Sequence, residues 1–365
     1  MKVLIASLHL THAGGVANYV GLLLRNIQGH DMEQFVQGLP PRYHRSFILP
    51  FVYAVQCFQF SARLNAFKPD LVHLNPSLTW ASLIRDTVLL LIARRKGYRV
   101  LFFIRGWRWP LYERVKKTRP LRSLLRRALS SADMVLVLSQ DFRDALVVDL
   151  GVDATRIAVS STMVESRKYG VEGRSFIAPF RVLFCSQLHR EKGPAELLEA
   201  IPGILHKHPD TQFVFVGGGS LVDTLRMRAK STGIGRSVLF AGRQLGDAKI
   251  EWYRKAHVFV LPSYTEGFPT VVLEAMAAGL PLVVTPVGAL RHVLEHGRNG
   301  YILDRVPPQP GEISEKITSL LDSSETMQEM SECNMQEARD RYDVEVVAAQ
   351  IARLYDELCS SGAAR

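Results

Sequence analysis

The sequence predicts an α/β protein of two domains, each with a parallel β-sheet covered by helices. Short apolar runs alternate with helical segments along most of the chain, an order typical of parallel sheets. The 365 residues are enough for two domains of ordinary size. A stretch without hydrophobic periodicity, from Thr162 to Pro179, separates the two series. We therefore expect domains over 1–165 and 181–340, a linker over 166–180 and a last helical segment over 341–365.

The elements of the first domain are predicted from apolar runs bounded by turn residues, such as Lys68-Pro69-Asp70 before one strand and Gly151 after one helix. The region between Ile27 and Pro69 contains no motif that we can assign. The expected strands are Lys2–Ser7, Leu71–Leu74, Tyr98–Ile104, Asp133–Ser139 and Ile157–Val159, and the expected helices run from about Val16 to Ile27, up to Ile92, and from Asp141 to Leu150.

The second sheet is expected from Arg181 to about Asp304, and helices follow a proline-rich segment at 306–311. One helix should run from Pro194 to Ile201, and the last from Tyr342 to Leu358. Ligands of such sheets bind outside the carboxyl ends of the strands. Two sheets that face each other would form a cleft there.

Two carboxylates, Glu266 and Glu274, stand eight residues apart in the most informative segment of the chain. The buried strand Val258–Leu261 leads into a Gly-Pro loop that carries Glu266. A helix from Thr270 to Ala278 follows and contains Glu274. The positive N-terminal end of such a helix suits a phosphate, and Glu274 could accept hydrogen bonds from sugar hydroxyls.

Lys192 and Gly193 come after a strand and open the next helix, where a lysine can neutralise a diphosphate and a glycine allows close approach. Gly14 and Gly15 follow the first strand in a similar way. A glycine pair alone is weak evidence, but its position before a helix favours a place beside a ligand.

The segment Ser263–Gly279 resembles the donor-site motif of retaining GT-B glycosyltransferases, in particular glycosyltransferase family 4. Further segments resemble the family in the expected order, and together they cover about residues 180 to 305. These segments are Arg181–Gly193, Phe213–Gly219, Val238–Arg243, Pro281–Gly288 and Asn299–Leu303.

The resemblance implies a GT-B fold with two Rossmann-like domains facing a cleft and a last helix that crosses back to the first domain. It implies transfer of a hexose-type sugar, with retention, from a nucleotide-diphosphate sugar to a lipid-linked or polysaccharide acceptor. A role in cell-surface polysaccharide biosynthesis, such as that of lipopolysaccharide, would follow. The pattern fits uridine and guanosine diphosphate sugars alike.

The resemblance also assigns roles to residues. Glu266 would contact the donor sugar, Glu274 the ribose and Lys192 the phosphates. The other expected donor-binding residues are Gly14, Gly15, Gln187, Gly242, Arg243, Gly267, Phe268, Pro269 and Thr270.

The chain departs from the family pattern at two positions. Gln187 stands where an arginine is usual, and Arg190 can supply the second positive group beside Lys192. Arg105 stands where a histidine is frequent. An arginine cannot act as a general base at neutral pH, but it can hydrogen-bond a sugar or hold an acceptor phosphate. His73 is the other candidate on the acceptor side.

The net charge of +10 is concentrated in the first half, because residues 1–165 contain 22 basic and 11 acidic residues. The segment from Arg94 to Arg127 is strongly basic and includes Trp107, Trp109 and several leucines. Such a segment suits the surface of an anionic bilayer. A solvated basic helix face is the plainer alternative. We expect no nucleic-acid binding, because no nucleic-acid-binding motif accompanies the charge.

Other features exclude several classes of protein. The four cysteines form no C-x-x-C pair, which is typical of reduced thiols. No stretch reaches the ~20 apolar residues of a spanning helix, and no signal peptide is evident. A D-x-D motif at a strand end and a G-x-G-x-x-G motif are both missing, so we expect neither a metal nor a dinucleotide cofactor.

We therefore expect a cytoplasmic protein, peripheral on the cytosolic membrane face. Two alternatives stay open at this point. The departures at Gln187 and Arg105 also fit a catalytically weak nucleotide-sugar binding protein, and the basic half fits, less well, a nucleic-acid-binding protein.

Overall fold

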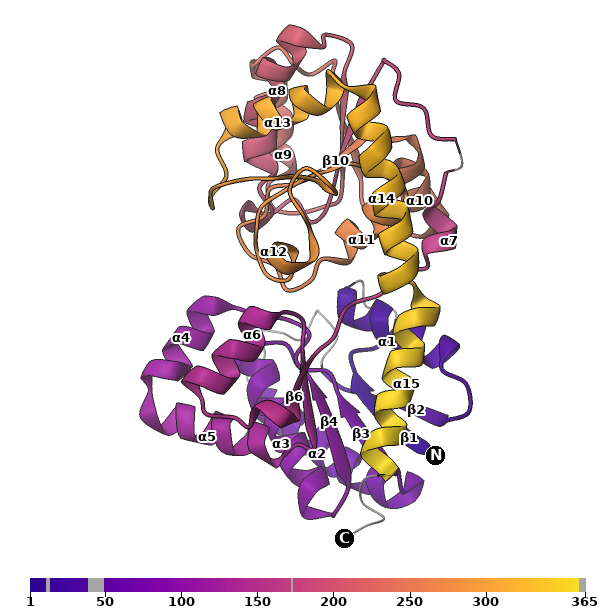
Figure 1. The fold of residues 1–365 in the computed structure, drawn as a ribbon. Coiled ribbons are helices and arrows are strands. Elements are labelled where there is room, and N and C mark those ends of the chain that lie inside the picture. The colour runs from indigo at the N-terminus through magenta and orange to yellow at the C-terminus, as the bar shows by residue number, and fades with distance from the viewer. Residues whose placement is uncertain (11–13, 39–48, 172, 361–365) are drawn as a thin grey trace. The chain divides into compact units, whose positions relative to one another are not determined.

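The computed structural model describes residues 1–10, 14–38, 49–171 and 173–360, which form two compact units (Figure 1). Unit 1 consists of Met1–Thr162 and Val344–Arg365, and unit 2 is Met163–Asp343. Each unit contains a six-stranded parallel sheet, so the predicted α/β class is confirmed.

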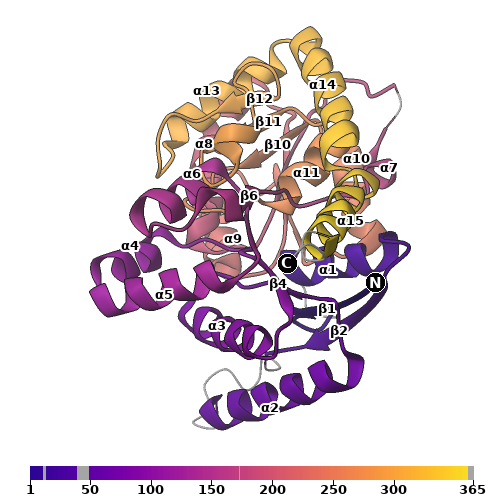
Figure 2. The ribbon, with the colours of Figure 1, turned by 60° about the horizontal axis from the view of Figure 1, so that its bottom comes forward.

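The sheet of unit 1 has the strand order β2-β1-β3-β4-β5-β6. Helices α1 and α15 lie on one face of this sheet, and α2 and α3 lie on the other (Figure 2). The strands are β1 (Lys2–Ser7), β2 (Asp31–Val36), β3 (Leu71–Leu74), β4 (Arg99–Phe103), β5 (Met134–Val137) and β6 (Ile157–Val159). The main helices are α1 (Gly15–Asn26), α2 (Leu49–Phe67), α3 (Trp80–Arg95), α4 (Trp109–Lys117), α5 (Arg119–Ser131), α6 (Gln140–Asp144), which continues as a π-helical turn over Ala145–Asp149, and α15 (Val344–Ser360).

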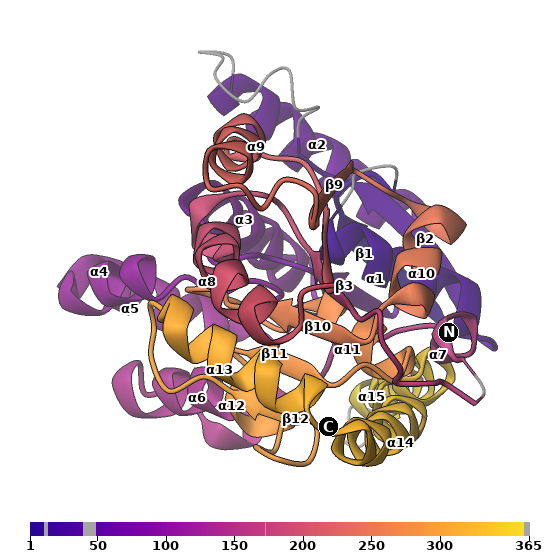
Figure 3. The ribbon, with the colours of Figure 1, turned by 90° about the horizontal axis from the view of Figure 1, so that it is seen from above.

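The sheet of unit 2 has the order β12-β11-β10-β7-β8-β9. Seen from above, α8, α9 and α13 cover one face, and α7, α10, α11 and α14 cover the other (Figure 3). The strands are β7 (Arg181–Cys185), β8 (Gln212–Val216), β9 (Val238–Gly242), β10 (Val258–Leu261), β11 (Leu282–Val284) and β12 (Gly300–Ile302). The helices are α7 (Ser166–Tyr169), α8 (Pro194–Lys207), α9 (Val222–Ser231), α10 (Gly246–Lys255), α11 (Thr270–Ala277), α12 (Leu290–Val293), α13 (Pro310–Leu321) and α14 (Ser324–Tyr342).

The central strands are mostly apolar because helices cover both of their faces, and His73 of β3 is an exception. All four residues of β10 and of β3 are buried. This is why these strands are recognisable in the sequence as mostly apolar runs rather than as alternating patterns. None of the helices within the described ranges is long and apolar enough to span a membrane.

Some elements differ from the sequence-based expectation. The segment 27–69 contains the strand β2 and the long helix α2, neither of which was predicted. Helix α8 continues past Pro202 to Lys207, because the proline ring lies on the exposed side. The segment expected to be a linker, 166–180, lies in unit 2 and includes α7 and the buried Arg174. Residues 11–13 of the loop after β1 lie outside the described residues.

Candidate active site

The candidate site of unit 2 lies at the carboxyl ends of β7 and β10, which are neighbours in the sheet. Helix α8 follows β7 and helix α11 follows β10, on opposite faces of the sheet (Figure 3). The two connecting loops therefore diverge, and open α/β sheets bind ligands at such a point. Gly193 lets the loops touch: its φ is +71°, and a Cβ atom there would lie 2.1 Å from the Pro262 carbonyl oxygen.

Lys192 and Glu266 meet at this point. The Lys192 Nζ donates a hydrogen bond to the Glu266 Oε1 at 2.7 Å, and the Ser263 Oγ donates to the same oxygen at 2.7 Å. The Glu266 side chain is only 9% exposed, so its charge depends on this lysine. Among the described residues no hydrogen bond reaches Oε2, which leaves that oxygen able to accept one from a ligand.

Glu274 is held inside α11 by two side chains of α10. The Lys249 Nζ lies 2.8 Å from its Oε1 and 2.5 Å from its Oε2, and the Tyr253 hydroxyl donates to Oε2 at 2.7 Å. Burial alone lowers the pKa of Lys249, but the Glu274 carboxylate and Cys185 reverse the shift and raise it overall. The lysine therefore stays charged at neutral pH, which compensates a carboxylate that is almost fully buried.

Lys249, Tyr253 and Ser263 were missed by sequence reasoning. Lys249 and Tyr253 stand four residues apart, so they share one face of α10. Only the fold brings that face against Glu274, which comes 21 residues after Tyr253 along the chain. The sole sequence signal was a buried glutamate in a helix without other charges, since such a residue needs a partner.

The other expected donor-binding residues of unit 2 are more scattered. Gln187 and Arg243 are exposed, and Gly242 ends β9, where its carbonyl accepts a hydrogen bond from Gly217. Arg190 is exposed and lies beside the Tyr264 hydroxyl. Burial and a hydrogen bond to Glu196 raise the pKa of Tyr264 to about 12, and the positive charge of Arg190 opposes this rise.

The loop before α11 is fixed partly by packing. Phe268 is buried and forms an edge-to-face contact with Tyr342, so it belongs to the apolar core. The Gly267 carbonyl accepts a hydrogen bond from the Ala289 N–H at 2.8 Å. Pro269 caps α11, and Thr270 is its first residue.

Unit 1 contains the four remaining candidates. Gly14 and Gly15 are exposed at the start of α1. His73 lies within β3 and is fully buried, and its Nδ1 is 2.6 Å from the Tyr355 hydroxyl. Burial and the nearby Arg105 lower the pKa of His73 to about 3, so the ring is neutral at pH 7. Arg105 is the second residue after β4 and is also buried.

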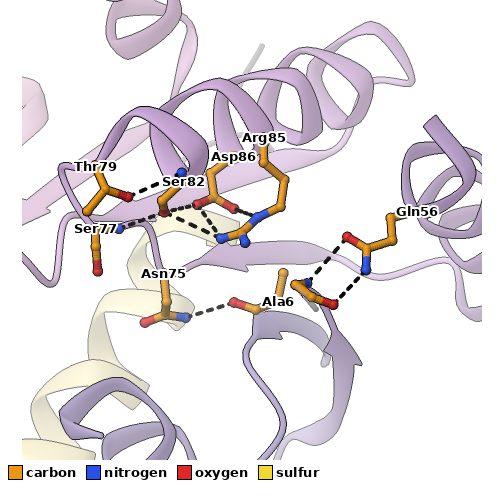
Figure 4. A network of polar contacts seen from close by, with 9 residues as sticks. Ala6, Gln56, Asn75, Ser77, Thr79, Ser82, Arg85 and Asp86 are labelled. Carbon is orange, nitrogen blue, oxygen red and sulfur yellow. Dashed lines mark hydrogen bonds and ion pairs between the residues drawn. The ribbon is translucent and has the colours of Figure 1, made fainter. Parts of the chain in front are cut away.

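A polar network fixes the loop between β3 and α3, against which Arg105 lies (Figure 4). The buried Asp86 accepts hydrogen bonds from Ser82 at 2.6 Å and from Arg85 at 2.9 Å. Ser82 in turn accepts from the Ser77 N–H at 2.9 Å. Asn75, which sequence reasoning did not single out, donates to the Ala6 carbonyl, and its Oδ1 has no partner.

The basic segment from Arg94 to Arg127 forms the end of α3, then β4, α4 and α5. Trp107 does not face outward as expected from the sequence, because it is buried with its ring stacked 4.5 Å from Phe142. Trp109 and Leu124 are exposed. The segment is therefore a basic helix surface with few apolar side chains on its outside.

Exposed apolar residues gather instead on the neighbouring helices α2 and α3. Both sets have helical spacing, which places each set on one side of its helix. They are Phe51, Val55 and Phe58 on α2, and Trp80, Ile84 and Val88 on α3.

Two family models match this chain over most of its length. The family described as glycosyl transferases group 1 matches residues 174–336, and the glycosyl transferase 4-like domain matches residues 14–161.

The curated relatives include two enzymes whose names contain an inositol compound. The D-inositol 3-phosphate glycosyltransferase of Corynebacterium jeikeium is 30% identical over 226 residues, which are 59% of this chain and 52% of that protein. The phosphatidyl-myo-inositol mannosyltransferase of Mycobacterium tuberculosis is 30% identical over 224 residues, 60% of this chain and 56% of that protein. The matched part thus spans about half the length of these relatives.

Solved structures share the fold across almost the whole chain. The Anabaena HepE complex with UDP has a TM-score of 0.74 at 17% identity and covers 98% of this chain and 100% of that one. The sucrose-phosphate synthase of Thermosynechococcus elongatus has a TM-score of 0.77 at 18% identity and covers 99% and 100%. At such identities the likeness concerns the fold alone, and it confirms the GT-B architecture.

Proposed function

This chain belongs to the glycosyl transferases group 1 family, and from that premise we propose that it moves a hexose-type sugar from a nucleotide-diphosphate sugar to a lipid-linked or polysaccharide acceptor, with retention. The observation that carries the proposal is the meeting of Lys192, Ser263 and Glu266 where β7 and β10 end. In this cluster the Lys192 cation, which can bind a diphosphate, lies next to the Glu266 carboxylate, which can accept a hydrogen bond from a sugar.

Lys192 has the role of stabilising the leaving group. Negative charge develops on the nucleoside diphosphate as the glycosidic bond breaks, and a fixed cation lowers the energy of that transition state. In the free protein the Lys192 Nζ forms an ion pair with the Glu266 Oε1 at 2.7 Å. When the donor binds, Lys192 turns to the diphosphate and Glu266 accepts a hydrogen bond from the donor sugar. Arg190 is exposed two residues before Lys192 and adds a second positive charge, because Gln187 stands where an arginine is usual.

Glu274 has the role of binding the ribose. Its carboxylate is already oriented by Lys249 and Tyr253, so ribose hydroxyls meet an acceptor with a fixed position. HepE binds UDP according to its description, which supports a uridine nucleotide as the first donor to test. We propose a reaction without a metal cofactor, because Lys192 supplies the positive charge and no D-x-D motif follows a strand.

The acceptor is proposed to be anchored in an anionic membrane. The two curated relatives have phosphorylated or lipid-linked inositol acceptors in their names. In unit 1, α5 has exposed arginines and packs on α3, and α3 packs on α2; both α2 and α3 have exposed apolar side chains. A bilayer with anionic headgroups satisfies both kinds of side chain. This supports a peripheral place on the cytosolic membrane face and a role in cell-surface polysaccharide biosynthesis.

The test is transfer of radiolabelled sugar to membrane extract by the purified protein, with a panel of uridine and guanosine diphosphate sugars. We expect one donor to be used, with and without a chelator. Glu266→Gln should lower kcat about 10²–10³-fold. Glu274→Gln should weaken nucleotide binding by about 1.5–3 kcal/mol, the range for a charged hydrogen bond.

The control is Glu315→Gln, since Glu315 is an exposed residue of unit 2. It should leave both quantities unchanged. Wild-type activity in both site variants would refute the assignment of the site. Nuclear magnetic resonance of the anomeric proton of the product decides whether the configuration is retained.

A second candidate function is that of a nucleotide-sugar binding protein with little catalysis. It is favoured by Gln187, which cannot offset charge where the family usually has an arginine. Binding of a nucleotide sugar without transfer or donor hydrolysis would support it. Salt-sensitive binding of RNA or DNA that nucleotide sugars leave unchanged would instead point to nucleic-acid binding.

A further inference from the structure

Arg105 is a buried cation that lacks a carboxylate partner in the part of the chain that the structure describes. It is 8% exposed, and its guanidinium lies 3.6 Å from the centre of the Tyr19 ring. Its Nη2 donates to the Thr162 Oγ1 at 3.1 Å and its Nη1 to the Ser161 carbonyl at 3.5 Å, while its Nε–H has no partner among the described residues. Burial lowers the pKa of Arg105 to about 10, so it is still charged at pH 7. An uncompensated buried charge costs stability, which calls for an explanation.

Arg174 in unit 2 is a buried arginine whose hydrogen bonds can be compared with those of Arg105. It is also 8% exposed, and burial likewise lowers its pKa to about 10. All of its nitrogens, however, donate to backbone carbonyls. The acceptors are Ala278 for Nε at 3.0 Å, Tyr253 for Nη2 at 3.3 Å and Ala256 for Nη1. The two arginines are thus equally buried, but only Arg105 has a donor left over.

The surroundings of Arg105 favour an anion. Tyr19 lies near the start of α1, so the positive end of that helix is close to the guanidinium. His73 is neutral and supplies no negative charge. Among the described residues, the Tyr19 hydroxyl, the His73 Nε2 and the Asn75 Oδ1 are also buried without a partner. They could donate to and accept from the remaining groups of a ligand.

The position of Arg105 is fixed by the loop after β3. The Arg105 N–H donates to the Pro76 carbonyl at 2.7 Å, and the Leu78 N–H donates to the Gly106 carbonyl at 2.7 Å. The network around Asp86 holds this loop from the other side (Figure 4). A cation in a preorganised site binds its ligand without a cost for ordering the site.

We propose that Arg105 binds an oxyanion of the second substrate, a phosphate or a carboxylate, in unit 1. This deepens the proposed function, on which it rests, by stating that the sugar acceptor carries a negatively charged group that unit 1 recognises. A planar guanidinium with a free Nε–H can form two parallel hydrogen bonds with such a group. An uncharged acceptor would leave Arg105 unpaired and should bind much more weakly.

The experiment compares thermal unfolding in potassium phosphate, sodium glucuronate and potassium chloride at equal ionic strength. Phosphate and glucuronate represent the two sources of the oxyanion. We expect one of them to raise the Tm of the wild-type protein above its value in chloride. Arg105→Met should lose this rise, and its Tm in chloride should equal or exceed that of the wild type, because an uncompensated charge is removed.

Three further variants make the result decisive. Arg174→Met should lower the Tm but keep the rise, since Arg174 is structural. Lys192→Met should keep the part of the rise that depends on Arg105, because Lys192 belongs to the site in unit 2. Arg105→Lys keeps a positive charge but lacks the planar guanidinium with its paired N–H groups, so the anion should raise its Tm less than that of the wild type. This variant tests the proposal if Arg105→Met does not fold.

Two outcomes would overturn the proposal. One is a wild-type protein whose Tm is the same in all three salts. The other is an Arg105 variant that keeps the full rise of the Tm.

The proposed function is tested separately by UDP binding and sugar transfer. If the protein transfers sugar but its Tm does not respond to the anions, the proposed function stands and only the anion site at Arg105 is refuted. With active protein, acceptors with and without a phosphate should then differ in KM for the wild type, less so for Arg105→Lys, and not for Arg105→Met.

Discussion

Lys249 supplies a positive charge beside the almost fully buried carboxylate of Glu274. The two side chains are 22% and 7% exposed and lie 2.5 Å apart. We predict that Lys249→Met lowers the free energy of unfolding by about 3 kcal/mol, because it leaves a buried carboxylate without its cation. Chemical denaturation measures this loss.

The matched control is Lys255→Met, a change on the same helix at an exposed lysine that pairs only with Glu251. It should change the free energy of unfolding by less than about 0.5 kcal/mol. Adding Glu274→Gln to Lys249→Met should restore part of the loss, since no unpaired charge then remains. A double variant less stable than either single variant would contradict the pairing.

His73 makes the stability of unit 1 sensitive to acid. Its pKa is about 3 in the folded protein, against about 6.5 in an unfolded chain. The unfolded state therefore binds the proton more tightly, and stability is lost as the pH falls below about 6.5. We expect the free energy of unfolding to decrease between pH 6 and 4 less steeply for His73→Gln than for the wild type, by about 1 kcal/mol per pH unit. The exposed His206, changed to Gln, is the control and should leave the slope unchanged.

At this scale the sequence predicted single residues better than their partners. Lys192 and Glu266 could be proposed because each follows an apolar strand at a Gly-containing loop. The hydrogen bond between them joins residues 74 positions apart, and the sequence contains no sign of it. Trp107 was wrongly expected on an outward-facing surface, because an aromatic residue near a strand end can face either the core or the solvent. The acceptor-side role of His73 stays a prediction, and its ring lies in the core.

Helix α5 is the element whose outer side is most basic. Arg122, Arg126 and Arg127 are all exposed on it, while Leu125, Ala128 and Leu129 face the core. If this side meets anionic lipid, replacing the three arginines by serine should remove about 3 kcal/mol of attraction at low salt, at about 1 kcal/mol for each. Co-sedimentation with phosphatidylserine vesicles should fall accordingly, and wild-type binding should weaken as salt rises.

A matched control removes the same charge from unit 2. Arg226, Arg228 and Arg236 are exposed there, and their replacement by serine should leave vesicle binding unchanged. Transfer to a soluble acceptor analogue should survive in both triple variants. Equal sedimentation of the α5 variant and the wild type would show that these arginines form a solvated helix side.

Helices and strands whose apolar residues follow a recognisable pattern along the sequence were predictable, and those without such a pattern were not. Strand β2 has mostly polar or half-exposed residues at the edge of its sheet, so no apolar run marks it. Apolar residues occur on all sides of α2, including the exposed Phe51 and Phe58, so its helical period is hidden. The strands β3 and β10 were found because burial on both faces demands a run of mostly apolar residues, which in β3 is interrupted by His73.

The whole molecule combines one continuous unit with one discontinuous unit. Unit 2 is a single stretch, Met163–Asp343, and contains Lys192, Lys249, Glu266 and Glu274. Unit 1 needs the last helix of the chain, because α15 packs on α1 and its Tyr355 bonds His73. The resemblance implied a last helix that returns to the first domain, and α15 confirms it, although the sequence contains no sign of the particular contact between Tyr355 and His73.

We predict that the two units differ when they are produced as fragments. The fragment 163–343 should unfold cooperatively and bind the same nucleotide as the full chain. The fragment 1–162 lacks the buried Val347, Ile351 and Tyr355 of α15. Each such side chain contributes about 1.5–3 kcal/mol, and their sum approaches the 5–15 kcal/mol that stabilises a typical domain. Fragment 1–162 should therefore show no cooperative thermal transition by circular dichroism until the peptide 344–360 is added. A sharp transition without the peptide would show that α15 is dispensable for unit 1.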